Sequence, residues 1–235
     1  MPAARLDDFS DRLSPMLVKE LRQGLRARTF IAVFLALQAL LALILLSAAS
    51  AASYDSAGMT ITRIIFLFFS LAVLVIQPLR GIGAVAAEIK AGTIDLMVLT
   101  RLSAWRIVFG KWIALVSQSA RLLTAIIPYL ILRYFFVEMD LLAELLLLAT
   151  VFLCSMLLTA VTVGMSASSS VLIRGILPVL GSPILVFMIL GFCLSGGIEE
   201  LIDFFTFSDP DSPLVFGSCL ALGLYLAWSA LDFGA

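Results

Sequence analysis

Between Leu141 and Ala167 the chain reads LLAELLLLATVFLCSMLLTAVTVGMSA, with Glu144 as its one charged residue. A helix needs about 20 predominantly apolar residues to cross the hydrocarbon core of a bilayer. This stretch is longer than that, and the core of a soluble domain has no use for so long an apolar run. We therefore predict that it crosses a membrane as a helix.

Five other apolar stretches of similar length occur in the chain. The composition agrees with them, because 62% of the residues are hydrophobic and 13% are charged. We predict an all-α polytopic membrane protein in which residues 30–235 form a single six-helix transmembrane domain and residues 1–29 a cytoplasmic interfacial segment. The six predicted spans are Phe30–Ser50, Ile64–Val85, Val108–Leu132, Leu141–Ala167, Leu172–Leu194 and Leu214–Leu231.

The distribution of charge predicts the orientation of these spans. With six crossings, the chain ends share a side with the second and fourth connections. Basic residues concentrate on that side, at Arg5, Arg12, Lys19, Arg22, Arg26, Arg28, Lys90, Arg101, Arg106, Lys111 and Arg174. The opposite side has Arg63 and Arg133 together with most of the acidic residues. Because cytoplasmic loops carry an excess of Lys and Arg, we expect both termini to be cytoplasmic.

The segment before the first span has a pattern of its own. Ser14-Pro15 is a favourable helix start, and Leu17, Leu21 and Leu25 then recur every four residues between basic residues. This predicts an amphipathic helix that lies on the cytoplasmic lipid surface. A solvated basic tail is the simpler alternative. A cleavable signal peptide is another, although a leader of about 30 residues and an apolar run of about 20 are long for one.

Composition also excludes several kinds of chemistry. The chain has no histidine, so Ser-His-Asp and Cys-His triads and imidazole metal sites are absent. Cys154, Cys193 and Cys219 are scattered through apolar spans without metal-ligand spacing, and we expect them to pack as small apolar side chains. No Walker A pattern occurs. We therefore expect no enzymatic activity and no nucleotide or other cofactor bound directly by this chain.

A short charged segment joins the second and third spans. It reads EIKAGTIDLMVLTRLSAWRIVFGK from Glu88 to Lys111. Gly92 interrupts the preceding helix, Thr93 can cap a new one, and Asp95 lies in its first turn, where the helix dipole favours negative charge. We predict a short, largely apolar helix at the cytoplasmic mouth, followed by a helix that starts near Ser103. Such a helix suits a groove on a partner; the alternative is an ordinary interfacial loop.

This segment resembles the cytoplasmic coupling region of type-2 ABC-transporter permeases. That family has an E-x-E-x-G-T-[LI]-[ED]-x-L-L run, then T-P-L-S, then a helix that ends in G-K. The residues that match are Glu88, Gly92, Thr93, Asp95, Leu99, Thr100, Leu102, Ser103, Gly110 and Lys111. The leader from Ser14 to Gln23 and the six-span layout also resemble the family, so the likeness covers nearly the whole chain. Lys90 and Arg101 depart from the pattern, and these departures leave open which ATPase the chain would pair with.

The resemblance implies a function and partners. Such permeases act as pairs, so a second permease half, identical or not, is expected in the cytoplasmic membrane of a bacterium. Separate ATPase subunits bind ATP and Mg²⁺ and dock on the coupling segment, residues 88–106. The expected docking residues are Glu88, Gly92, Thr93, Asp95, Leu96, Leu99 and Arg101. Membrane lipid is expected as a partner, and nucleic acid is not.

Arg121 lies well inside the third span, beside several small polar residues. A cation near the bilayer centre costs at least about 3 kcal/mol on insertion scales, so it should face the bundle interior, a partner half or a wet path. A route for anionic or polar headgroups would explain it, and so would a structural ion pair with an acid near the outer surface. The residues leave both interpretations open.

Two further patterns bear on the choice of function. Leu194-Ser195-Gly196-Gly197 matches the start of the ABC ATPase signature, but no other nucleotide motif accompanies it, and we predict a small-residue turn there, followed by a short amphipathic helix to Phe207. The function expected from the resemblance is that of the transmembrane permease subunit of an ATP-binding-cassette exporter. The alternative is a non-transporting scaffold or regulator of cell-envelope machinery built on the same permease fold. An intramembrane enzyme is disfavoured, because no convergent His, Cys or acidic constellation exists.

Overall fold

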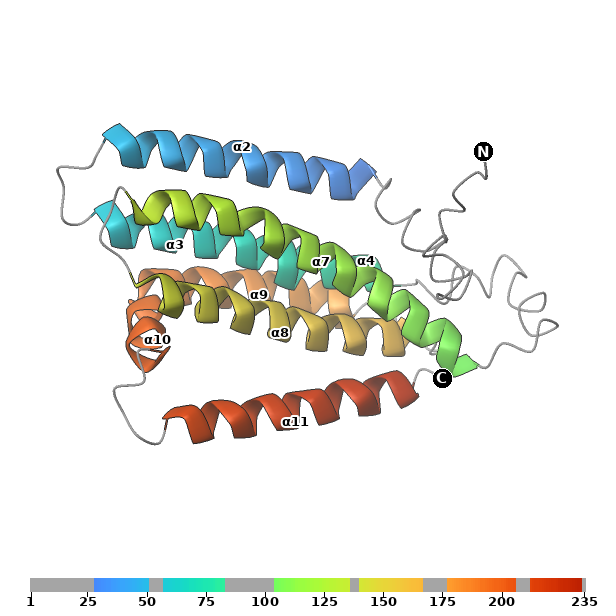
Figure 1. Cartoon of the computed structure of the whole chain (residues 1–235). Helices are drawn as coiled ribbons and strands as arrows, with labels where there is room; N and C mark the ends of the chain where they lie inside the picture. Colours follow the sequence, from blue (N-terminus) through green and yellow to red (C-terminus); the bar gives the residue numbers. More distant parts are fainter. Residues whose placement is uncertain are drawn as a thin grey trace, which may run out of the picture.

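The computed structural model describes residues 28–50, 57–82, 104–135, 140–166, 177–205 and 212–233. Every regular element in these ranges is a helix. Long helical rods lie roughly side by side and alternate in direction along the chain (Figure 1). The rods are α2 (Arg28–Ser50), the continuous α3 (Ala57–Ser70), η2 (Leu71–Ile76) and α4 (Gln77–Gly81), then α7 (Ala104–Tyr134), α8 (Leu141–Ser166), α9 (Leu177–Leu194) and α11 (Ser212–Phe233).

Several of these rods are long and apolar enough to cross a membrane, which identifies the chain as a membrane-embedded protein. Four meet that description on their own: Met59–Gly81, Trp105–Tyr134, Leu141–Ser166 and Pro213–Phe233. A fifth crossing is possible in the bent pair of α9 and α10 (Gly197–Phe205). The first predicted span corresponds to α2, whose apolar part is the shorter stretch Phe30–Ile44. The all-helical architecture is therefore confirmed, and the full count of six crossings stays a prediction.

The second rod contains a π-helical segment, η2, ahead of Pro78. A proline ring clashes with the carbonyl group four residues earlier, and here that carbonyl belongs to Leu74, inside η2. The wider turn of a π-helix gives this carbonyl room, so the rod continues through the proline as α4. The wider turn is how the helix accommodates the proline.

Helix α8 lies in the centre of the bundle, where it packs against α7, α11, η2 and α4. Asp140 caps its start, because the Oδ1 atom accepts hydrogen bonds from the backbone N–H groups of Leu142 and Ala143 at 3.0 and 3.2 Å. Its buried side chains, including Leu147, Leu148 and Val151, join the main apolar core. The long apolar stretch Leu141–Ser166 is thus the helix around which the others assemble.

The short helix α10 follows a sharp turn at the end of α9. Gly196 adopts a φ of +86°, in the left-handed region that glycine tolerates best, and α10 leaves at 74° to α9. Its apolar residues Ile198 and Phe205 are buried. The predictions of a small-residue turn and a short amphipathic helix are confirmed here.

Helices α2 and α11 form opposite edges of the bundle (Figure 1). Their outward faces are apolar: Leu43 and Leu46 on α2, and Leu214 and Trp228 on α11, are more than half exposed. In water such a surface would promote aggregation, whereas lipid tails solvate it without cost. The edges therefore have the composition of lipid-facing helices.

Candidate functional site

The predicted docking residues Glu88, Gly92, Thr93, Asp95, Leu96, Leu99 and Arg101 lie outside the described residues, as does the interfacial segment up to residue 27. The structure does describe the helices on either side. Helix α4 ends at Gly81 and α7 begins at Ala104 at the same end of the bundle, and the two helices pack together (Figure 1). The start of α7 also agrees with the predicted helix start near Ser103.

Arg121 lies near the middle of α7, and its side chain is exposed on the outside of the bundle formed by this chain. No ion pair joins it to another described residue. The prediction that it faces the interior of this chain's own bundle is therefore wrong. The reason lies in helix register: Leu122 and Ile126, the core residues nearby, lie on a different face from Arg121. A partner half or a wet path remains as its predicted environment.

Arg133, at the end of α7, is instead a buried cation of the bundle. Its side chain is 2% exposed and forms an ion pair with Glu144, which is 7% exposed. Arg133 Nη2 also donates to Thr62 Oγ1 at 2.9 Å, and Thr62 donates to Glu144. The cluster joins the end of α7, the start of α8 and the start of α3. A buried charge is tolerated only when it is paired and hydrogen-bonded, and this cluster meets that condition.

A second ion pair lies at the same end of the bundle. Arg63 on α3 pairs with Glu199 on α10, and both side chains are more than a third exposed. The sequence placed both arginines of this end, Arg63 and Arg133, in connections on one side of the membrane. The structure brings each arginine to a glutamate, so the acidic residues Asp140, Glu200 and Asp203 dominate the charge of this end.

A polar group lies toward the opposite end, where α4 meets α7. Arg80 donates to Gln77 at 3.1 Å and also to Gln118 on α7, and Gln77 and Gln118 are both almost fully buried. The guanidinium carbon of Arg80 lies 6.0 Å from the centre of the Phe30 ring on α2. The Arg80 side chain thus turns toward the amide side chains of the bundle.

Between these two groups, hydroxyl side chains bridge the helices at the level of the π-helical segment. Ser155 on α8 donates to the backbone carbonyl of Val73 in η2 at 2.8 Å. Its hydroxyl is 3.4 Å from that of Ser119 on α7. A carbonyl without its usual helical partner is costly in a bilayer, so a donor from a neighbouring helix is favourable here. The interior thus contains interhelical hydrogen bonds along much of its length.

These interior groups hold the helices together and fix their positions relative to one another. Within the described ranges no group of three or more Cys, Asp or Glu side chains is arranged to hold a metal ion. Sequence reasoning missed the Arg133–Glu144 pair. One signal was available, namely opposite charges eleven positions apart on either side of a short connection between two spans.

Comparisons with protein-family models and with curated proteins found no match to this chain.

Proposed function

We propose that this chain is the transmembrane permease subunit of an ATP-binding-cassette transporter, acting as an exporter. Separate ATPase subunits dock on residues 88–106, and a second permease half completes the assembly. The observation that carries the proposal is the order and spacing of the motifs between Glu88 and Lys111, together with the layout of the apolar stretches. No residue of this chain is assigned to ATP hydrolysis, which belongs to the partner subunit.

The helix arrangement supports this function in a mechanical sense. The connection that contains the coupling motif starts from α4 and ends in α7, and α7 extends over 31 residues. Force applied at the start of α7 is transmitted along one continuous helix to the Arg133–Glu144 pair at its other end. A lever of this kind needs stiff helices that are tied to their neighbours, and the buried Arg133–Glu144 pair and the interhelical hydrogen bonds supply the ties.

The charges of the described residues support the proposed orientation, with six crossings and both termini cytoplasmic. Arg28, Arg80 and Arg106 lie toward the end at which α4 stops and α7 starts, and acidic residues dominate the α10 end. Under the positive-inside rule these charges favour a cytoplasmic coupling segment, which an ATPase in the cytoplasm of a bacterium can reach.

The exposed Arg121 supports a second permease half. A cation in the middle of a spanning helix is costly against lipid tails, and within this chain it has no acidic partner among the described residues. A neighbouring permease half or a polar translocation path beside α7 would supply the missing solvation.

The docking role is tested by exchanging Leu96 and Leu99 for Asp. Charges on the apolar side of the predicted coupling helix should abolish co-purification of the ATPase, because an unpaired charge cannot enter an apolar groove without a large cost. Phe233→Asp is the matched control, since Phe233 is 74% exposed at the end of α11, on the same side of the bundle. The measurement is the amount of ATPase that co-purifies with the tagged chain from its native host.

Unchanged co-purification of the Leu96→Asp/Leu99→Asp variant would refute the docking role. If the ATPase co-purifies but substrate-stimulated ATP turnover is absent in vesicles, the scaffold or regulator alternative is favoured over the exporter.

A further inference from the structure

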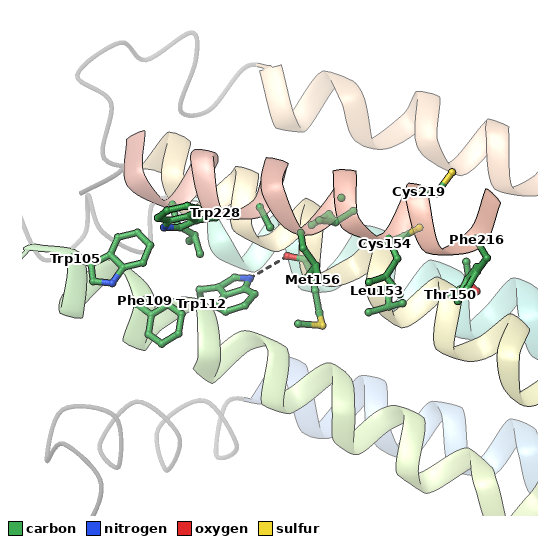
Figure 2. A pocket seen from close by; sticks show the side chains of 16 residues that line it. Trp105, Phe109, Trp112, Thr150, Leu153, Cys154, Met156, Phe216, Cys219 and Trp228 are labelled. Carbon is green, nitrogen blue, oxygen red and sulfur yellow. Dashed lines mark hydrogen bonds between the residues drawn. The ribbon is translucent and has the colours of Figure 1, made fainter. Parts of the chain in front are cut away.

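A long apolar groove runs along the outer surface between α7, α8 and α11. Its cavity volume is about 240 Å³, and its wall is almost entirely apolar. At one end it begins near Trp105 and Trp228, and it extends to Thr150 and Phe216 (Figure 2). Fifteen residues separate Phe216 from Leu231, the outermost groove residues of α11, so the groove is about 22 Å long at 1.5 Å per helical residue.

Aromatic side chains form one wall of the groove at the end where α7 begins. Trp105 and Phe109 are stacked with ring centres 5.8 Å apart, and Phe109 and Trp112 follow at 5.4 Å. Trp112 is fixed in place, because its Nε1–H donates to the Met156 carbonyl on α8 at 3.0 Å (Figure 2). Tryptophan residues concentrate at the headgroup level of membranes, so this end of the groove lies at the membrane surface and the other end reaches into the hydrocarbon.

Among the described residues, one exposed arginine and one exposed aspartate each directly follow a residue that lines this end of the groove, its mouth. Arg106 directly follows Trp105 and is exposed, about a quarter-turn of the helix from the aromatic wall. Asp232 directly follows Leu231, a lining residue of α11, and is exposed as well. The groove thus combines an apolar channel along the membrane normal with a cation and an anion at the surface.

We propose that this groove is a binding site for one glycerophospholipid, with an acyl chain between α7, α8 and α11 and the phosphate group on Arg106. A zwitterionic headgroup matches the mouth best, since its ammonium group is attracted to Asp232 while its phosphate contacts Arg106. The site does not depend on the coupling segment or on transport.

Packing and charge explain why a phospholipid would stay in the groove and not exchange freely with the surrounding bilayer. Lipid tails are as apolar as the groove wall, so the hydrophobic effect gives no advantage to either location. An acyl chain that is held on three sides by α7, α8 and α11 gains dispersion contacts with the protein. A hydrogen bond between a charged donor and a phosphate adds more, and its loss corresponds to roughly a tenfold change in occupancy.

Native mass spectrometry of the protein released from nanodiscs tests the site. We expect one retained phospholipid per chain. Cys154 and Cys219 line the groove from α8 and α11 (Figure 2), so the double variant Cys154→Phe/Cys219→Phe fills it and should lower the retained phospholipid about tenfold. Arg106→Gln should lower the retained phospholipid by a similar factor while leaving the groove open.

Two matched controls separate the site from ordinary boundary lipid. Leu180→Phe/Met188→Phe places the same two phenylalanine side chains on the exposed face of α9, outside the groove. Arg28→Gln removes an exposed arginine from the start of α2, at the same end of the bundle as the mouth. Both controls should retain the phospholipid at the wild-type level. If Cys154→Phe/Cys219→Phe retains as much phospholipid as Leu180→Phe/Met188→Phe, the proposal is overturned.

A second measurement uses the unaltered protein, in case the filled variant does not fold. A phospholipid with a photoreactive group in its acyl chain should cross-link to the α8 and α11 peptides that contain Leu153 and Cys219. The proposal is overturned if the cross-links are spread evenly over α2 and α9. It is also overturned if the retained molecule is a free fatty acid or a detergent, or if a second copy of this chain covers the groove.

Discussion

The pair formed by Arg133 and Glu144 shows how much the position of one charged residue depends on its neighbours. Both residues flank a short connection. From the sequence alone, Arg133 was placed in that connection and Glu144 just inside the following span. In the structure both are buried and share Thr62 as a partner. A buried pair contributes little net stability compared with apolar residues of the same volume, but the loss of one partner leaves an uncompensated charge.

At this scale we predict that Glu144→Leu destabilises the protein strongly. Removing the carboxylate leaves the Arg133 guanidinium buried without its counter-charge, which should lower the free energy of unfolding by about 3–5 kcal/mol. The double variant Arg133→Met/Glu144→Leu should recover most of that loss. The measurement is the unfolding midpoint on titration with SDS in mixed micelles.

The exposed pair of Arg63 and Glu199 provides the control. Glu199→Leu should change the free energy of unfolding by no more than about 1 kcal/mol, because solvent screens a pair that is more than a third exposed. Similar losses in the two glutamate variants would contradict the assignment of Arg133–Glu144 as the buried pair.

Gly164 lies where α8 and α11 approach each other closely. A Cβ atom at Gly164 would lie 2.1 Å from the carbonyl oxygen of Ala230, so only glycine allows the two helices to approach this closely. The contact draws the two helices together near the mouth of the apolar groove, where Ala227 and Leu231 form part of a small second core.

We therefore predict that Gly164→Ala destabilises the protein although alanine is the better helix former. Forcing α11 away from α8 should cost about 1–3 kcal/mol, as overpacking in other cores does. Gly217→Ala is the matched control on α11, because nothing lies within 4 Å of the added Cβ atom there, and it should be neutral or stabilising by up to about 1 kcal/mol. The measurement is the thermal unfolding midpoint of each variant in detergent. If Gly164→Ala is as stable as Gly217→Ala, α8 and α11 are free to separate and the prediction is wrong.

Helix positions could be predicted from the apolar stretches, and side-chain environments could not. The predicted spans Leu141–Ala167 and Val108–Leu132 agree with α8 and α7 to within a few residues. The second span was predicted to start at Ile64, whereas its helix starts at Ala57. Thr62 and Arg63 ended the apolar stretch, but each has a partner, on α8 and α10 respectively, and the helix continues past them. Such partners are distant in sequence and leave no local signal.

For the molecule as a whole, the sequence indicated the membrane environment and the two ends of opposite charge. It could not indicate which face of α7 turns outward, because every face of a long apolar helix contains apolar residues. The exposure of Arg121 and the groove along α11 follow from how the helices pack against one another. Periodicity identifies a buried face only when the opposite face is polar, and lipid removes that contrast.

The proposed orientation leads to a labelling prediction. In a background with Cys154, Cys193 and Cys219 changed to Ala, single-cysteine variants at Ser10 and Thr100 should resist a membrane-impermeant maleimide in intact cells. Variants at Ser56 and Ser208 should react, because with six crossings they lie outside. Permeabilised cells, in which all four should react, provide the control. Labelling of Thr100 in intact cells would remove the coupling segment from the cytoplasm.

The two arginines at the α10 end also impose an order on biosynthesis. In the proposed orientation both must be carried across the bilayer as the chain leaves the ribosome. Arg133 and Glu144 are eleven positions apart in one helical hairpin, so they can cross together as a neutral couple. Arg63 is 136 positions from Glu199 and must cross long before its partner is synthesised. Insertion of the α2–α3 hairpin is thus the step at which an unpaired arginine has to cross the bilayer.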